Sequence, residues 1–221
     1  MKPDIVQNRI QALPPGDWRF TGRIGKRIDR ISAARFTDAG AWERYYPQTE
    51  EAFRERQDDR SHAPAGVWRG EFWGKYILGA IAACRYYGSD ELKKRIRSAA
   101  HGLISTRSEN GYIGTYSISE KHGPETWNIW CRKYTLWGLL EAWDLLKDSW
   151  ILNAAVRFTD HLMSEVGPGK HDIVRTGRFN GLPSTSILGP ILKLYRVTGD
   201  KRFLEYGRYI VRQWSVHPEG P

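Results

Sequence analysis

The chain has 221 residues, 40% of them hydrophobic, and carries a formal net charge of +9. No apolar run reaches the roughly 20 residues that a membrane-spanning helix requires, and the N-terminal residues lack the apolar segment of a secretory signal peptide. We therefore expect no membrane partner and a cytoplasmic location.

The positive charge permits attraction to acidic polymers, such as nucleic acids or uronate-bearing polysaccharides. The basic residues are spread over segments such as 23–30 and 93–97, which read as solvated faces of helices and match no known nucleic-acid motif. We therefore expect no nucleic-acid partner. Cys84 and Cys131 lie in apolar-periodic segments without metal-ligand spacing, so reduced, buried thiols are expected.

The N-terminal quarter of the chain predicts an arm followed by short helices. Residues 1–20 form the expected arm, because Pro14 and Pro15 break any helix there. Apolar residues at helical spacing predict a helix over 21–36. Further helices are predicted over 39–46, where Pro47 ends the segment, and over 50–58.

Three later stretches repeat one pattern, with starts about 55 residues apart, which is typical of a repeated supersecondary unit. Each unit is a helix, a short polar turn and a second helix, and Gly88, Asp148 and Gly199 mark the three turns. The predicted helix pairs are 71–87 with 91–105, 127–146 with 150–166, and 184–196 with 201–214. The pattern predicts an all-α fold, an incomplete (α/α)6 toroid of repeated helical hairpins.

The first helix of each pair begins with polar and aromatic residues, in segments 68–76, 127–134 and 178–186. In a ring of hairpins, equivalent helix starts converge, so these clusters predict one shared cavity. The ten Trp and eleven Tyr residues suit the walls of a sugar-binding cleft as well as a core. We expect an oligosaccharide substrate, bound by Trp73, Tyr112, Trp127, Trp130, Arg132, Lys133 and Asn180.

Glu71 is the candidate catalytic residue, because Trp68, Phe72 and Trp73 surround it in sequence. An apolar setting raises the proton affinity of a carboxyl group, which suits a general acid. The alternative is that Glu71 pairs with Lys75 one turn later or caps a helix start. No second carboxylate can be paired with Glu71 for glycoside hydrolysis.

Four segments together carry a family resemblance: 68–75 (WRGEFWGK), 110–116 (NGYIGTY), 127–134 (WNIWCRKY) and 194–204 (LYRVTGDKRFL). In this order they resemble the β-L-arabinofuranosidase-like glycoside hydrolases, the family 127 group. The resemblance covers about residues 20–221. It implies an (α/α)6 barrel followed by β-sandwich domains, and retaining hydrolysis of an L-arabinofuranoside or related plant-polysaccharide sugar.

The resemblance also implies a cysteine nucleophile at a zinc site, formed by residues later in the chain than this sequence reaches. We therefore expect no cofactor within these residues, and residues 21–221 to be a partial barrel domain, truncated at its C-terminus. Trp137-Gly138 and Gly181-Leu182-Pro183 replace the Gly-His and Gly-His-Pro patterns of the family. With Arg132 and Lys133 nearby, this departure favours another sugar, an acidic one.

Two other functions fit the same residues. One is a non-catalytic carbohydrate-binding helical module, and the other is a binder of acidic polymers, for which the net charge of +9 is the observation. A third alternative, closer to the hydrolase in function, is a lyase that acts on uronic polysaccharides. Nothing in the sequence specifies an oligomeric state.

Overall fold

The computed structural model describes residues 13–14, 16–57, 67–117 and 122–216. These residues form helices and contain no β-strand, so the predicted all-α class is confirmed. None of their helices combines the length and the apolar character that crossing a membrane requires. The helices are α1 (Gly22–Ser32), α2 (Ala39–Tyr45), α3 (Pro47–Gln57), α4 (Gly70–Tyr87), α5 (Asp90–Ser105), α6 (Asn128–Leu146), α7 (Ser149–Glu165), α8 (Leu182–Thr185), α9 (Leu188–Thr198) and α10 (Lys201–Gln213).

The three predicted hairpins are present, and all three turns use the same chemistry. Each first helix ends at a residue with positive φ: Gly88 (66°), Lys147 (54°) and Gly199 (71°). A capping side chain follows at once, because Ser89, Asp148 and Asp200 accept hydrogen bonds from backbone N–H groups in the first turns of α5, α7 and α10. These caps satisfy donors that a helix start leaves unpaired, so they fix where each second helix begins.

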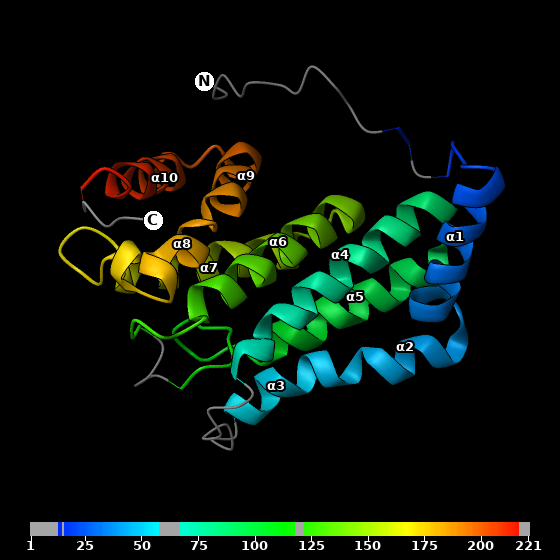
Figure 1. Ribbon diagram of the computed structural model, residues 1–221, viewed down its shortest axis with the longest axis horizontal. Coiled ribbons are helices and arrows are strands. Elements are labelled where there is room, and N and C mark those ends of the chain that lie inside the picture. The colour runs from blue at the N-terminus through cyan, green and yellow to red at the C-terminus, as the bar shows by residue number, and fades with distance from the viewer. Residues whose placement is uncertain (1–12, 15, 58–66, 118–121, 217–221) are drawn as a thin grey trace.

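Helices α4 and α6 are the first helices of two hairpins and lie side by side, running in the same direction (Figure 1). Glycines allow this close approach. A Cβ atom on Gly74 would lie 2.1 Å from the Tyr134 carbonyl oxygen, and one on Gly138 would lie 2.8 Å from the Trp73 ring. Both distances are far below van der Waals contact, so only glycine fits at these two positions.

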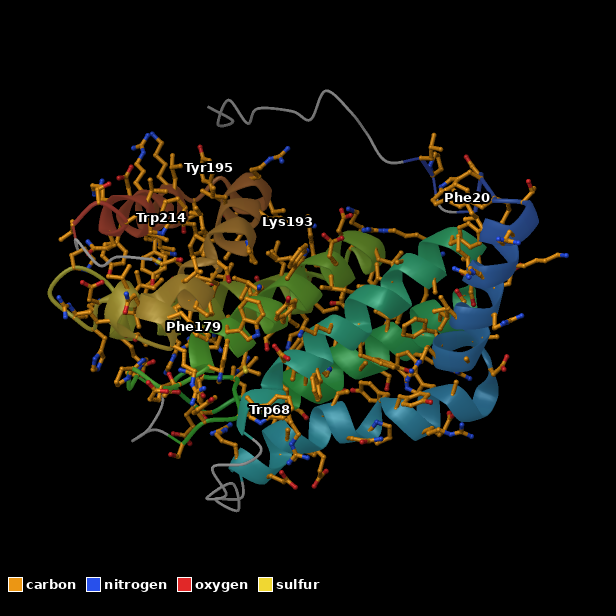
Figure 2. All side chains as sticks on the ribbon, in the orientation of Figure 1. Phe20, Trp68, Phe179, Lys193, Tyr195 and Trp214 are labelled. Carbon is orange, nitrogen blue, oxygen red and sulfur yellow. The ribbon has the colours of Figure 1, made fainter. Side chains whose placement is uncertain are left out.

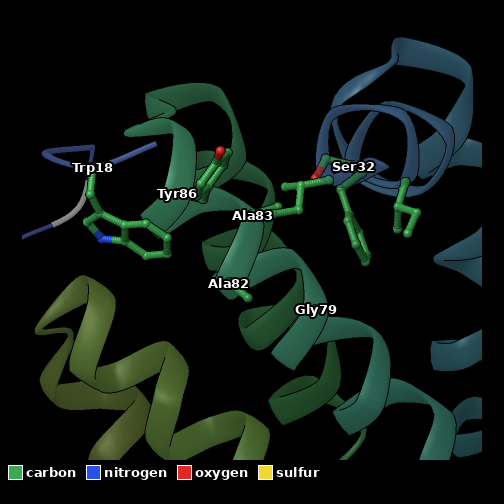
Figure 3. A pocket seen from close by; sticks show the side chains of 9 residues that line it. Trp18, Ser32, Gly79, Ala82, Ala83 and Tyr86 are labelled. Atoms are coloured by element: carbon green, nitrogen blue, oxygen red, sulfur yellow. The ribbon is translucent and has the colours of Figure 1, made fainter. Parts of the chain in front are cut away.

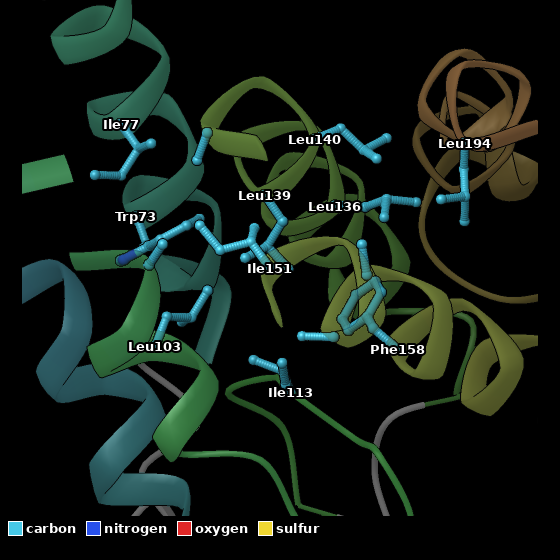
Figure 4. Packing of buried hydrophobic residues seen from close by; sticks show 14 of the residues in the cluster. Trp73, Ile77, Leu103, Ile113, Leu136, Leu139, Leu140, Ile151, Phe158 and Leu194 are labelled. Carbon is cyan, nitrogen blue, oxygen red and sulfur yellow. The ribbon is translucent and has the colours of Figure 1, made fainter. Parts of the chain in front are cut away.

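Helices α5 and α7 form a second layer, packed on their hairpin partners and on each other. The apolar core lies between the layers and includes Trp73, Ile77, Leu103, Leu136 and Leu139 (Figure 4). Helices α2 and α3 extend this core along one edge, and α8 to α10 lie at the opposite end of the molecule (Figure 1).

Two predicted helix boundaries are wrong. The segment expected over 50–58 begins at Pro47, which suits the first helical position because its missing N–H would be unpaired there. The segment expected over 184–196 is two helices, α8 and α9, which separate at Ser186 and Ile187. Pro190 lies in the first turn of α9, where a residue without an N–H loses no helical hydrogen bond.

The expected N-terminal arm falls partly outside the described residues. Its later part contacts the C-terminal end of α4. The Phe20 backbone N–H donates to the Tyr86 hydroxyl at 2.9 Å, and the Trp18 ring packs edge-on against Tyr86 with centroids 5.2 Å apart. The Gly16 N–H donates to the Arg85 carbonyl at 2.7 Å.

Substituting Gly74→Ala tests the close contact of α4 and α6. The added methyl group would overlap the α6 backbone, so we expect a loss of about 1–3 kcal/mol in the free energy of unfolding. Gly189→Ala in α9 is the matched control, because no atom lies within 4 Å of its Cβ position. The control should raise the free energy of unfolding by at most about 1 kcal/mol, because Ala has a higher helix propensity than Gly. Urea denaturation measures the free energy of unfolding of both variants. Equal changes for Gly74→Ala and Gly189→Ala would contradict the close contact of α4 and α6.

Candidate functional site

A row of aromatic rings follows one face of α6. Trp127, Trp130, Tyr134 and Trp137 are spaced three, four and three residues apart, which places them on the same side of a helix. The Trp127 and Trp130 centroids are 6.1 Å apart, those of Trp130 and Tyr134 5.1 Å, and those of Tyr134 and Trp137 6.4 Å. We call these four residues the aromatic row. Trp137 is 40% exposed, so one end of the row is open to solvent.

A loop residue from the third hairpin region extends the row at its other end. The Phe179 ring lies 6.1 Å from that of Trp127 and is 68% exposed. Figure 2 shows Phe179 and Trp68 at the end of the molecule where α4 and α6 begin. Phe179 and Asn180 have positive φ values, 53° and 51°. Bulky residues rarely adopt this conformation, which costs energy and is concentrated at functional sites.

Glu71 faces the aromatic row from the first turn of α4. The Trp130 Nε1–H donates a hydrogen bond to Glu71 Oε2, and Lys75 Nζ lies 2.9 Å from Glu71 Oε1. The Glu71 side chain is 14% exposed. The pairing with Lys75 that the sequence offered as an alternative is therefore present, and the Trp130 bond places the same carboxylate on the aromatic row. The role of Glu71 as a general acid stays a prediction.

Lys133 lies on the aromatic row with its charge against two rings. Its Nζ is 3.5 Å from the Trp130 centroid and 4.1 Å from that of Tyr134, distances at which ring faces attract cations. The residue is 6% exposed. The pKa of Lys133 is lowered to about 8, mainly by burial and in smaller part by the nearby charge of Lys75, while Glu71 opposes the shift.

Arg132, which precedes Lys133 in the sequence, points into the protein and does not contact the aromatic row. It is fully buried between α6 and α7, where its guanidinium lies 3.4 Å from Glu165 Oε2 and donates to the Phe158 carbonyl at 3.3 Å. His161 Nδ1 lies 3.1 Å from the same guanidinium. Burial lowers the pKa of Arg132, while Tyr112 and Glu165 raise it. The prediction that Arg132 lines a sugar cleft is not met, because protein groups surround it.

Two other predicted binding residues are also in the core. Trp73 is fully buried and packs against Gly138 at the contact of α4 and α6. Tyr112 is 1% exposed, and its hydroxyl donates to the Tyr116 carbonyl at 3.1 Å. Burial raises the pKa of Tyr112 to about 12. The structure thus brings together Glu71, Trp127, Trp130 and Lys133, with Asn180 adjacent to Phe179, and places Trp73, Tyr112 and Arg132 elsewhere.

Sequence reasoning missed Tyr134, Trp137 and Phe179 as members of the site. The three-and-four spacing of Trp127, Trp130, Tyr134 and Trp137 is the available signal, but a buried apolar helix shows the same spacing. Beyond Trp137 the same face carries Glu141 and Asp144. Both accept from Arg85, at 3.0 and 2.7 Å, so these carboxylates are engaged within the protein.

The described residues contain no group of three His, Cys, Asp or Glu side chains arranged to hold a metal ion. Both thiols are buried, and burial raises the pKa of each. The Cys131 Sγ donates to the Trp68 carbonyl at 3.1 Å. Neither cysteine therefore fits a zinc-bound nucleophile.

A pocket of about 280 Å³ lies apart from the aromatic row, between α1 and the C-terminal half of α4. Gly79, Ala82 and Ala83 form one wall, and Trp18 and Tyr86 flank it (Figure 3). Its lining is almost entirely apolar and includes no Asp, Glu, His, Cys, Lys or Arg side chain. The aromatic row, with Glu71 and the two lysines, is therefore the candidate site.

Comparison with known proteins gives one family. The family model described as "Beta-L-arabinofuranosidase, GH127 catalytic domain" matches residues 25–219. Among solved structures, the GH127 beta-arabinofuranosidase BT3674 superposes with a TM-score of 0.67 at 16% identity, over 93% of this chain and 34% of that one. A GH127 beta-L-arabinofuranosidase from Geobacillus stearothermophilus T6 superposes with a TM-score of 0.62 at 17% identity, over 86% of this chain and 30% of that one.

This chain thus spans about a third of each of these two solved proteins. No curated protein matches the sequence. The two superpositions confirm the helical fold, including the part of an (α/α) toroid that the repeated hairpins predict.

The environment of Arg132 gives a stability prediction. Glu165→Ala removes the carboxylate that faces the buried guanidinium, and an uncompensated buried charge costs about 3–5 kcal/mol. Arg132→Met removes the charge itself and fills much of the same space, so it should cost less than Glu165→Ala. Thermal or urea unfolding of the two variants measures the order. A smaller loss for Glu165→Ala would show that Arg132 is not held by this pair.

Proposed function

Because the chain belongs to the family of GH127 β-L-arabinofuranosidase catalytic domains, we propose that it is part of a glycoside hydrolase. Its substrate would be an oligosaccharide carrying an L-arabinofuranoside or a related plant-polysaccharide sugar. The aromatic row carries this proposal, because partly exposed rings in line offer apolar faces to the C–H faces of sugars.

In this proposal the aromatic row and Glu71 have separate roles. The rings bind and orient the sugar. Glu71, held by Trp130 and Lys75, is the acidic group at the row. Protonation of the leaving-group oxygen is the step that a positioned carboxyl group contributes in glycoside hydrolysis. Lys75 Nζ lies 2.9 Å from Glu71 Oε1 and holds the carboxyl group in position beside the row.

No step of the proposed reaction is assigned to zinc or to Cys84 and Cys131, because the buried thiols do not fit a metal-bound nucleophile. A zinc-bound cysteine, which the family resemblance implies, would come from residues other than those described. Its chemistry would be the nucleophilic half of a retaining reaction.

Trp137→Ala tests sugar binding on the aromatic row. Loss of one stacking ring should weaken binding of an arabinofuranosyl oligosaccharide roughly 3- to 10-fold, corresponding to about 0.5–1.5 kcal/mol. Trp150→Ala is the matched control, because Trp150 is 42% exposed, compared with 40% for Trp137, and lies on α7 beside His101. Isothermal titration calorimetry measures both. Equal affinities for the two variants would contradict binding at the row.

Glu71→Gln tests catalysis and separates a hydrolase from a non-catalytic binding module. The glutamine amide is not a general acid, so in a protein that also contains the nucleophile the release of arabinose should fall at least 100-fold. Binding should change little, because the rings remain. Release of reducing sugar measures hydrolysis, and calorimetry measures binding, for the variant and the unsubstituted protein. Undiminished hydrolysis would remove Glu71 from the reaction. Binding without any hydrolysis by a protein that also contains the nucleophile would favour the binding module.

A further inference from the structure

Lys133 is a largely buried cation that pairs with no carboxylate among the residues that the structure describes. Its Nζ makes no hydrogen bond or ion pair with any described residue, and the residue as a whole is 6% exposed. Buried charges are normally paired, because leaving water without a partner costs free energy. The faces of Trp130 and Tyr134 compensate part of this cost, but they accept none of the three N–H bonds that an ammonium group can donate.

The neighbouring charges do not supply the missing partner. Glu71 has one oxygen 2.9 Å from Lys75 and accepts at the other oxygen from Trp130. Lys75 is itself 4.9 Å from the Tyr134 centroid, so both ammonium groups face the same ring. Two positive charges and one negative charge therefore meet on the aromatic row, which leaves one positive charge in excess.

Comparison with Arg132, the preceding residue, shows that Lys133 differs in having no acidic partner among the described residues. Arg132 and Lys133 are the two buried cations among the residues that the structure describes. Arg132 has Glu165 at 3.4 Å and a carbonyl acceptor from α7. Lys133 is less completely buried, at 6% exposed against 0% for Arg132, and lies on the side of α6 that carries the aromatic row, where Trp137 is exposed. The unpaired charge is thus placed at the candidate sugar site and not within the core.

We propose that Lys133 recognises the carboxylate of an acidic sugar, so that the saccharide bound on the aromatic row contains a uronate. This inference rests on the proposed function, because it requires that the row binds sugars. The sugar carboxylate would supply the hydrogen-bond acceptor and the negative charge that no described residue supplies at Nζ. The sugar ring itself would lie on the exposed part of the row, where its binding does not depend on Lys133.

A matched pair of saccharides tests the inference. The probes are α-1,4-linked trigalacturonate and its carboxyl-reduced form, which differ in charge but have the same rings and linkages. Calorimetry on the 221-residue chain at pH 6.5 and low salt should show the acidic trimer binding roughly 10- to 100-fold more tightly, as expected for a charge-assisted hydrogen bond. Lys133→Met should remove this preference, so that the acidic and the neutral trimer bind with equal affinity.

Lys94→Met is the matched control, because Lys94 is exposed on α5 and its loss lowers the net charge by the same amount. It should keep the preference for the acidic trimer. A fall in preference equal to that of Lys133→Met would assign the effect to the overall charge and overturn the proposal. Circular dichroism checks the fold of both variants, and Lys133→Met should be no less stable than the parent chain because it removes an unpaired buried charge.

The pH dependence provides a second readout. Because burial lowers the pKa of Lys133 to about 8, the ammonium form that binds a carboxylate predominates below this pH and is lost above it. Preference for the acidic trimer should therefore fall between pH 7 and pH 9, while the affinity for the neutral trimer stays constant. A preference that persists unchanged at pH 9.5 would contradict the role of Lys133.

The outcomes separate this inference from the proposed function. Equal binding of both trimers, or a preference that survives Lys133→Met, overturns the acidic-sugar inference and leaves sugar binding intact. Failure of both trimers and of the arabinofuranosyl oligosaccharide to bind overturns the proposed function together with the inference.

Discussion

The close contact of α4 with α6 is the constraint on which the rest of the structure depends. Gly74 and Gly138 let the two backbones approach to a distance that a methyl group would forbid. At this distance a short acidic side chain on α4 reaches an indole on α6, so Glu71 and Trp130 can form a hydrogen bond. With a wider spacing, the carboxylate and the aromatic row would lie on separate surfaces.

The same contact divides the residues of α6 between two environments. Residues that face α7 are surrounded by protein, and Arg132 accordingly finds Glu165 and a backbone carbonyl there. On the ring-bearing face, Lys133 has the π-faces of Trp130 and Tyr134 against its charge and no hydrogen-bond partner among the described residues. Two basic residues that are neighbours in the sequence therefore have different roles. Arg132 links α6 to α7 through Glu165 and a backbone carbonyl, and Lys133 places a positive charge at the candidate site.

Much of the fold could be predicted from the sequence, because local chemistry determines it. Gly88 with Ser89, and Gly199 with Asp200, are turn and cap signals that require no knowledge of tertiary packing. The site could be predicted only in part. A helical wheel does not show which face of α4 or α6 will be buried, so Trp73 and Arg132 were assigned to a cleft when both lie in the core. That distinction depends on where the neighbouring helix packs.

Indole Nε1–H resonances of the ten Trp residues would test sugar binding on the aromatic row most directly. Titration with an arabinofuranosyl oligosaccharide, followed in ¹⁵N-labelled protein, should shift the signals of Trp127, Trp130 and Trp137. The signals of buried Trp73 and of Trp150 on α7 should stay in place. Shifts confined to Trp150, or spread evenly over all the indoles, would contradict a saccharide site on this face of α6.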